Sequence, residues 1–189
     1  MESFLIAGIG NIGEEYENTR HNIGFRIVEA LAKKHGVAFN ANRRYGAVAE
    51  FSLKGRKITL LKPSTYVNLS GKAVRYWMTE AKVPLHHLMV VVDDLALPFG
   101  SLRLKSQGSD GGHNGLKNIQ EIMNTNNYPR LRFGIENNFP KGGQSDYVLG
   151  EWSKEEEAKL PEYITKAVDT IESFCLIGIE RTMNTYNKK

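Results

Sequence analysis

The hydrophobic positions of this 189-residue chain switch between strand-like and helix-like patterns along its length. Short continuous apolar runs, such as Phe4–Ala7 and Leu88–Val92, are typical of strands that are buried on both faces. Between such runs, apolar residues recur at intervals of three and four, which predicts amphipathic helices that end near Gly36 and Pro84. Strands that alternate with helices in this way predict an α/β fold.

Other segments add antiparallel strands and C-terminal helices to this picture. Lys54-Gly55 lies between two apolar segments and is typical of a hairpin turn, so we expect a mixed sheet. Ser153, followed by three glutamates, predicts the N-cap of a long helix. We therefore expect residues 1–189 to form a single three-layer α/β/α domain with a mixed, mostly parallel twisted sheet, a mobile loop over 137–150 and C-terminal helices over 153–187.

Composition narrows the class of protein only modestly. The hydrophobic content of 41% and charged content of 24% are ordinary for a globular protein. No apolar run approaches the ~20 residues of a membrane-spanning helix, so we expect no membrane association. Cys175 is the only cysteine, which excludes an internal disulfide and favours a cytoplasmic protein.

Charge is unevenly distributed along the chain. Residues 151–172 hold seven acids and three lysines and therefore carry a net charge of −4. Because the whole chain has a net charge of +4, the remaining residues carry a net charge of +8. A positive body with an acidic helical appendage is compatible with a polyanionic partner. A charged, solvent-exposed helix beside a slightly basic surface explains the same numbers equally well.

The glycines of Gly8–Gly13 have the spacing of a dinucleotide-binding fingerprint and follow a predicted strand. That fingerprint needs a helix to begin at its last glycine, so that the helix N-terminus faces the pyrophosphate. Here Glu14, Glu15 and Glu17 follow instead, and their charge would repel a phosphate. We interpret the glycines as a sharp turn that presents Asn11.

Several predicted strand ends carry polar side chains that suit hydrolysis of a carbonyl compound. Because the carboxyl ends of parallel strands meet at one edge of the sheet, we expect these side chains to lie together. Histidine can act as a general base near neutral pH, a carboxylate can fix its tautomer, and carboxamides can hold peptide-like groups. No serine or cysteine nucleophile is evident. The set consists of Asn11, His21, Asn68, Asp93, His113 and Asn114.

Simpler interpretations exist for some of these residues. Thr19 or Asn22 could cap the following helix, and Asn68 could be an N-cap as well. Gly111–Gly115 precedes a helical pattern, so its backbone N–H groups could instead bind an anion or a polarised carbonyl. Cys175 lies in an apolar helix face and is expected to be core.

Seven segments together closely resemble bacterial peptidyl-tRNA hydrolases, and they occur in the order that is typical of that family. They are Gly8–Gly13, Thr19–Gly24, Asn68–Ala73, Asp93–Pro98, Gly111–Lys117, Arg130–Gly134 and Tyr147–Gly150. The resemblance implies cleavage of the ester bond between the peptide and the tRNA 3′ ribose, which recycles tRNA from peptidyl-tRNA released during translation. It also implies a monomer that needs no metal or organic cofactor.

The resemblance assigns roles to individual residues. His21 would be the base that activates water, and Asp93 would orient it. Lys105 and Arg132 match positions that clamp the tRNA 5′ phosphate. Substrate-binding residues would be Asn11, Tyr16, Tyr66, Asn68, His113 and Asn114.

Five residues depart from the usual pattern of that family: Ile12, Ala96, Phe99, Asp110 and Glu136. None of them replaces an expected catalytic group, so we expect them to affect RNA-facing loops and not the reaction. Two other functions compete with this one. One is an RNA-binding relative without chemistry, and the other is a dinucleotide-binding oxidoreductase based on Gly8–Gly13.

Overall fold

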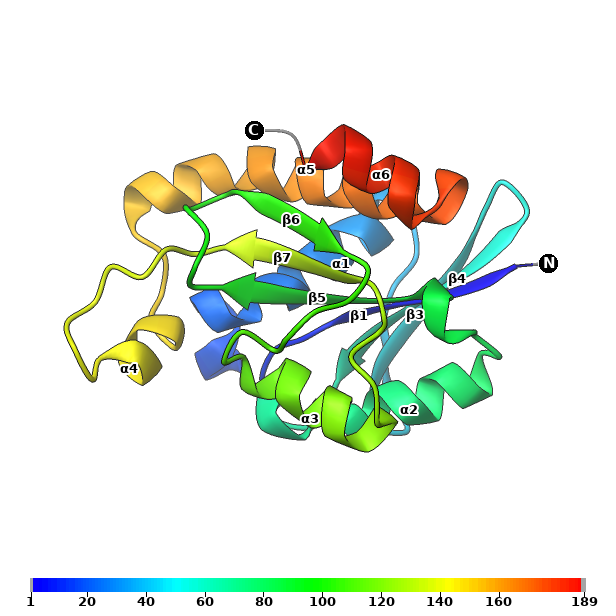
Figure 1. Ribbon diagram of the computed structural model, residues 1–189, viewed down its shortest axis with the longest axis horizontal. Helices are drawn as coiled ribbons and strands as arrows, with labels where there is room; N and C mark the ends of the chain where they lie inside the picture. The colour runs from blue at the N-terminus through cyan, green and yellow to red at the C-terminus, as the bar shows by residue number, and fades with distance from the viewer. Residues whose placement is uncertain (1, 188–189) are drawn as a thin grey trace.

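A seven-stranded sheet runs through the middle of the protein, and helices cover both of its faces (Figure 1). The computed structural model describes residues 2–187. The strand order is β2-β3-β4-β1-β5-β7-β6; the central strands β4, β1, β5 and β7 are parallel, and the outer pairs are antiparallel. The strands are β1 Ser3–Gly8, β2 Asn40–Arg43, β3 Gly46–Leu53, β4 Arg56–Pro63, β5 Leu88–Asp94, β6 Leu102–Lys105 and β7 Arg130–Gly134.

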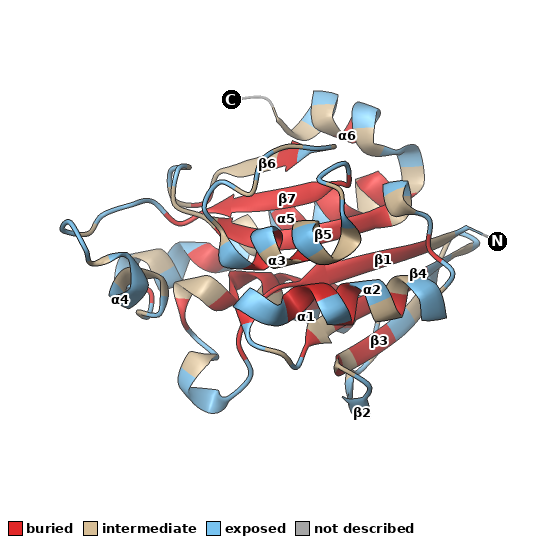
Figure 2. Cartoon of the chain, turned by 60° about the horizontal axis from the view of Figure 1, so that its bottom comes forward, coloured by how far each residue is buried: buried red, intermediate tan, exposed pale blue. Residues whose placement is uncertain are grey.

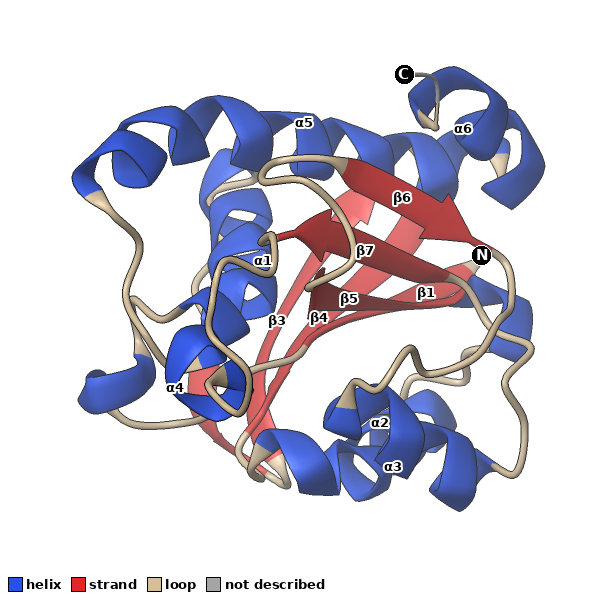
Figure 3. Cartoon of the chain, turned by 60° about the vertical axis from the view of Figure 1, so that its left-hand side comes forward, coloured by secondary structure: helices blue, strands red, loops and turns tan. Residues whose placement is uncertain are grey.

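Two helical layers enclose the sheet. Helices α1 and α5 pack on one face and α2 and α3 on the other, as Figure 3 shows. The α-helices are α1 Ile23–Lys34, α2 Ser70–Glu80, α3 Asn114–Met123, α4 Gln144–Val148, α5 Lys154–Ile177 and α6 Ile179–Tyr186. Single 3₁₀ turns are η1 Glu14–Tyr16, η2 Arg20–Asn22, η3 Val67–Leu69 and η4 Leu85–His87. The expected three-layer α/β/α fold with a mixed sheet is confirmed.

The alternation of side chains along β1 builds two cores. Phe4 and Ile6 belong to the core beneath α1 and α5, whereas Leu5 and Ala7 belong to the core beneath α2 and α3. Figure 2 shows that the central strands are buried and that the exposed residues lie on the outer faces of the helices and in the connecting loops. Within residues 2–187, no helix has both the length and the apolar character required to cross a bilayer.

Two glycines bring α1 close to the carboxyl ends of β1 and β5. A Cβ atom on Gly8 would lie 2.3 Å from the carbonyl oxygen of Gly24, and one on Gly24 would lie 2.5 Å from that of Val91. Only residues without a side chain permit this approach. The turn η2, which comes directly before α1, is therefore held at the carboxyl edge of the sheet.

Local signals at several element boundaries are confirmed, while two segments differ from expectation. Ser153 and Glu156 form a reciprocal capping box at the start of α5. Strand β2 was not predicted, because its four residues are exposed and polar or small and therefore lack an apolar period. Part of the segment expected to be an irregular loop, 137–150, folds as the short helix α4.

Candidate active site

A cleft of about 580 Å³ opens at the carboxyl edge of the parallel strands. Its walls come from the segments after β1, β4 and β5, from the start of α3 and from α4. Eight of the residues predicted from the sequence line it, and they are Asn11, His21, Tyr66, Asn68, Asp93, His113, Asn114 and Arg132. Two other predicted residues, Tyr16 and Lys105, lie outside its lining.

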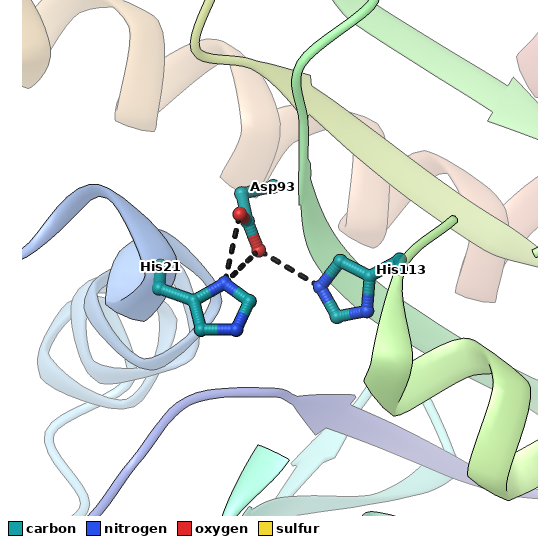
Figure 4. Close-up of side chains that lie close together, drawn as sticks. All are labelled: His21, Asp93 and His113. Atoms are coloured by element: carbon teal, nitrogen blue, oxygen red, sulfur yellow. Dashed lines mark hydrogen bonds and ion pairs between the residues drawn. The ribbon is translucent and has the colours of Figure 1, made fainter. Parts of the chain in front are cut away.

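Asp93, at the end of β5, joins two histidines in a continuous hydrogen-bonded chain (Figure 4). His21 Nδ1 lies 3.0 and 2.9 Å from the two carboxylate oxygens, and His113 Nε2 lies 2.9 Å from Oδ1. The Asp93 side chain is only 3% exposed, so water cannot substitute for these partners. The centres of the two imidazole rings are 5.2 Å apart.

The backbone of α3 determines which nitrogen of His113 carries the proton. His113 Nδ1 accepts hydrogen bonds from the backbone N–H groups of Gly115 and Leu116, at 3.0 and 3.3 Å. Its Nε2 therefore donates to Asp93. This arrangement corrects the interpretation of Gly111–Gly115 as a free anion-binding turn, because the histidine side chain itself satisfies the first N–H groups of the helix.

The charge of Asp93 sets the protonation of His21. Burial would raise the pKa of the Asp93 carboxyl, but the two histidines outweigh burial and hold this pKa well below its usual range. A carboxylate can only accept, so neutral His21 donates from Nδ1 and keeps a lone pair on Nε2. Burial would lower the pKa of His21, but the Asp93 charge and hydrogen bond outweigh burial and raise this pKa above its usual 6.5.

Asn11 is held in the cleft wall by two other segments. Its Oδ1 accepts from Val67 N–H at 2.8 Å, while its backbone N–H and C=O bond to the side chain of Asn22 at 2.8 and 2.9 Å. The interpretation of Asn22 or Thr19 as a side-chain cap of the next helix is wrong, because neither makes a capping hydrogen bond. Asn22 instead fixes the turn that presents Asn11.

The other two carboxamides are open to solvent. Asn68 lies in η3 and Asn114 is the first residue of α3, and both are exposed at the cleft. Asn68 is not an N-cap, since α2 begins at Ser70 and its N-cap residue, Leu69, makes no capping hydrogen bond. Tyr66 beside them is 55% exposed. Exposed polar groups around a buried His–Asp pair leave room for a substrate that brings its own hydrogen-bonding groups.

The two residues predicted to clamp phosphate occupy different environments. Lys105 is exposed at the end of β6. Arg132 on β7 is 8% exposed; its guanidinium donates to the carbonyl of Ser109 at 2.7 Å and lies 3.5 Å from the carboxylate of Asp94. That these two residues bind phosphate stays a prediction, and the Arg132 guanidinium already contacts Ser109 and Asp94.

Arg20, which no local sequence pattern singles out, anchors the turn that carries His21. Its guanidinium donates to the Tyr147 carbonyl at 3.1 Å and to the Glu156 carboxylate at 3.2 Å, and it lies 4.1 Å from the centre of the Tyr147 ring. Its backbone N–H donates to the carbonyl of Gly150 at 3.0 Å. These partners are distant in the sequence, so no local pattern could indicate them.

Two of the five unusual residues, Phe99 and Asp110, have a structural explanation. Phe99 packs edge-on against Tyr163, with ring centres 5.3 Å apart, and also lies against Trp152. Asp110 accepts a hydrogen bond from Gly112 N–H at 2.8 Å and so shapes the turn before His113. Glu136 has a φ of 64°, a conformation in which glycine is unstrained. The side chain of Ile12 is exposed, at 47%, and nothing in the structure explains Ala96.

A cysteine nucleophile and a bound metal ion are the two alternatives to the histidine–carboxylate pair. Cys175 is buried, and burial raises the pKa of its thiol to about 12, so it remains uncharged and unreactive as expected for a core residue. His21, Asp93 and His113 do present ligand atoms within 4.8 Å of one another. A metal ion there would have to displace the protons that now join both histidines to the carboxylate. The absence of a metal requirement therefore stays a prediction.

The dinucleotide interpretation finds no support at Gly13. The residues that follow it form the single 3₁₀ turn η1, and the first α-helix begins only at Ile23. The fold and the cleft, with its histidine–carboxylate pair and three carboxamides, instead define a hydrolase of esters or amides.

Comparison with known proteins specifies which hydrolase. A family model described as peptidyl-tRNA hydrolase matches residues 5–189, and the chain belongs to this family. The peptidyl-tRNA hydrolase of Phocaeicola vulgatus is 60% identical over 186 residues, which cover 98% of this chain and 99% of that protein. That of Porphyromonas gingivalis is 59% identical, covering 97% and 99%. The crystal structure of the Acinetobacter baumannii enzyme matches with a TM-score of 0.91 at 34% identity, covering 97% of this chain and 94% of that chain. The protein is therefore an enzyme that hydrolyses peptidyl-tRNA.

Proposed function

We propose that the enzyme cleaves the peptide–ribose ester with a water molecule that His21 activates. The observation that carries this mechanism is the hydrogen bond between His21 Nδ1 and Asp93, which leaves Nε2 of His21 as a free acceptor within the cleft. Nε2 takes a proton from water while the water oxygen attacks the ester carbonyl carbon. The bond to the ribose 3′ oxygen then breaks, and that oxygen receives the proton back from Nε2.

The remaining polar groups support this reaction in different ways. The Asp93 carboxylate stabilises the imidazolium that forms during proton transfer. His113 binds the second side of Asp93 and so holds the carboxylate in place. The carboxamides of Asn11, Asn68 and Asn114 face the cleft and would donate to the carbonyl oxygen and the peptide backbone.

The His21→Ala variant tests the mechanism. It should lose ~10²–10⁴-fold in kcat on N-acetyl-aminoacyl-tRNA, because a general base contributes about that much. Circular dichroism and the thermal midpoint serve as the control for folding. Activity close to that of the unaltered enzyme would refute the role of His21. The same assay with a chelator tests the expected independence from metal, and inhibition by the chelator would contradict it.

We also propose that the enzyme acts as a monomer in the cytoplasm. The hydrogen-bonded chain of His21, Asp93 and His113 is complete within one copy of the protein, so the proposed reaction does not require a second copy. The single, buried cysteine and the family's tRNA substrate support the location. Light scattering on the purified protein tests the first point, and a stable dimer at assay concentrations would contradict it.

A further inference from the structure

A side chain on α3, Asn118, is bonded to the start of α2. Its Oδ1 accepts a hydrogen bond from the backbone N–H of Gly71, in the first turn of α2, at 2.7 Å. Helices α2 and α3 pack side by side on the same face of the sheet, as Figure 1 and Figure 3 show. The bond therefore links two elements whose contacting residues are 47 positions apart in the chain.

This bond supplies an acceptor that α2 lacks locally. The first N–H groups of a helix have no partner within the helix, and an N-cap side chain usually accepts from one of them. The N-cap residue of α2 is Leu69, whose apolar side chain cannot accept a hydrogen bond. Asn118 supplies from the neighbouring helix what a polar N-cap residue would otherwise supply.

Gly71 allows the two helices to approach closely at this point. A Cβ atom on Gly71 would lie 2.6 Å from Ile122 Cγ1 and 2.8 Å from both the backbone oxygen and Oδ1 of Asn118. A residue with a side chain would have to push the helices apart, so only glycine permits this arrangement. The start of α2 is therefore held directly against α3.

The turn that carries Asn68 is held by a carboxamide at each end. At its start, Val67 N–H donates to Asn11 Oδ1 at 2.8 Å, and at its end Gly71 N–H donates to Asn118 Oδ1. Asn68 lies between these two contacts and is exposed at the cleft, so burial does not hold it in place. Its position in the cleft wall therefore depends on where the two ends of the turn are fixed.

Asn118 also has a fixed relation to the third carboxamide of the cleft. Asn114 and Asn118 are four residues apart on α3, so they lie on the same side of the helix, about 6 Å apart along its axis. Asn114 lines the cleft, whereas Asn118 is not among its lining residues. The bond from Asn118 thus fixes the turn of Asn68 relative to the helix that presents Asn114.

We propose that Asn118 is a positioning residue for the hydrolysis of peptidyl-tRNA. It sets the spacing between the carboxamides of Asn68 and Asn114, so that both can bind the peptide backbone at the same time. It acts through Asn68 and not by contact with the substrate. The proposal rests on the role that the proposed function gives to these two carboxamides.

The first test removes the acceptor and then restores it. Asn118→Ala should raise KM for N-acetyl-aminoacyl-tRNA about fivefold, the factor that one neutral hydrogen bond contributes. Its kcat should stay within about twofold, because the bonds of Asp93 to His21 and His113 are unchanged. Asn118→Asp keeps an oxygen that accepts from Gly71, at a helix N-terminus where negative charge is favourable. Its KM should stay within about twofold of that of the unaltered enzyme.

Asn40→Ala is the matched control. Asn40 Oδ1 also accepts from a backbone N–H, that of Asn42 at 2.9 Å, but it lies on β2 at the edge of the sheet. Its KM should equal that of the unaltered enzyme. Circular dichroism and the thermal midpoint of each variant show whether it folds.

A double-mutant cycle separates positioning from a general structural role. We add Asn118→Ala to the variant Asn68→Ala and compare the two. If Asn118 acts through Asn68, the second substitution should change KM by less than about twofold. A purely structural role would raise KM by the same fivefold factor in both backgrounds, because independent effects are additive in free energy.

Three results would overturn the proposal. The first is a KM for Asn118→Ala equal to that of Asn40→Ala, and the second is an equal rise in KM for Asn118→Asp and Asn118→Ala. The third is a fivefold rise that persists when Asn68 is already alanine. A failure of the proposed function looks different. An unchanged KM in Asn68→Ala alone would refute the role given to Asn68, and this proposal with it, whereas turnover by His21→Ala would refute the base and leave the KM comparison intact.

Discussion

The Asp93→Asn substitution tests whether the carboxylate controls the proton on His21. The side chain keeps its shape but replaces one oxygen with an NH₂ group. His113 Nε2 donates its proton and still requires an oxygen, which lies 2.9 Å away at the Oδ1 position. The NH₂ group then occupies the Oδ2 position, 2.9 Å from His21 Nδ1. Two donors cannot face each other, so His21 is driven to carry its proton on Nε2.

The expected loss follows from this change of tautomer. With a proton on Nε2, the imidazole has no lone pair to accept a proton from water. The corresponding change in a Ser-His-Asp triad costs a factor on the order of 10⁴ in kcat. That factor equals about 5 kcal/mol of transition-state stabilisation.

The assay is the pH dependence of kcat/KM on N-acetyl-aminoacyl-tRNA. In the unaltered enzyme, activity should fall as the pH drops through the raised pKa of His21, above 6.5, because the protonated ring cannot act as a base. In Asp93→Asn the favourable charge is lost while burial remains, so the pKa of His21 should fall. The acid limb of the residual activity should therefore move to lower pH.

Asp94→Asn is the matched control. It removes a carboxylate from the next residue, which pairs with Arg132 and does not contact either histidine. We expect it to lose less than about tenfold in activity, because Asp94 does not contact His21. Loss of the general base itself would cost ~10²–10⁴-fold. If Asp93→Asn behaves like this control and its acid limb does not move, the reasoning about the tautomer is wrong.

Two further substitutions test the framework that holds the site. Arg20→Gln should lower the free energy of unfolding by about 2 kcal/mol, because it removes charged hydrogen bonds to Tyr147 and Glu156. The control Arg26→Gln breaks the more exposed pair with Glu157 and should lower the free energy of unfolding by less than ~1 kcal/mol. Equal losses for the two variants in urea unfolding would contradict the anchoring role of Arg20. Gly8→Ala should cost about 3 kcal/mol, because its Cβ would collide with the carbonyl of Gly24; an unchanged thermal midpoint would show that α1 does not approach β1 this closely.

The sequence was most informative where a local pattern has one physical solution. The apolar run of β5 suits only a strand that is covered on both faces, and Ser153 with Glu156 forms the capping box that its spacing suggests. Strand β2 was missed because exposed polar residues pair with β3 through the backbone alone. Asn22 was misinterpreted for a similar reason, since its partner Asn11 lies eleven residues away and beyond any local motif.

By itself the sequence determined the alternation of strands and helices and the chemistry available at the strand ends. Residue types and apolar periods are local properties, so they can be read without coordinates. Only the tertiary structure decided how that chemistry is arranged. His21 and Asp93 are 72 residues apart in the chain, and their hydrogen bond sets which nitrogen of His21 stays free. The same holds for the turn between β2 and β3, whose Arg44 carbonyl accepts from Trp77 Nε1 on α2, 33 residues further along the chain.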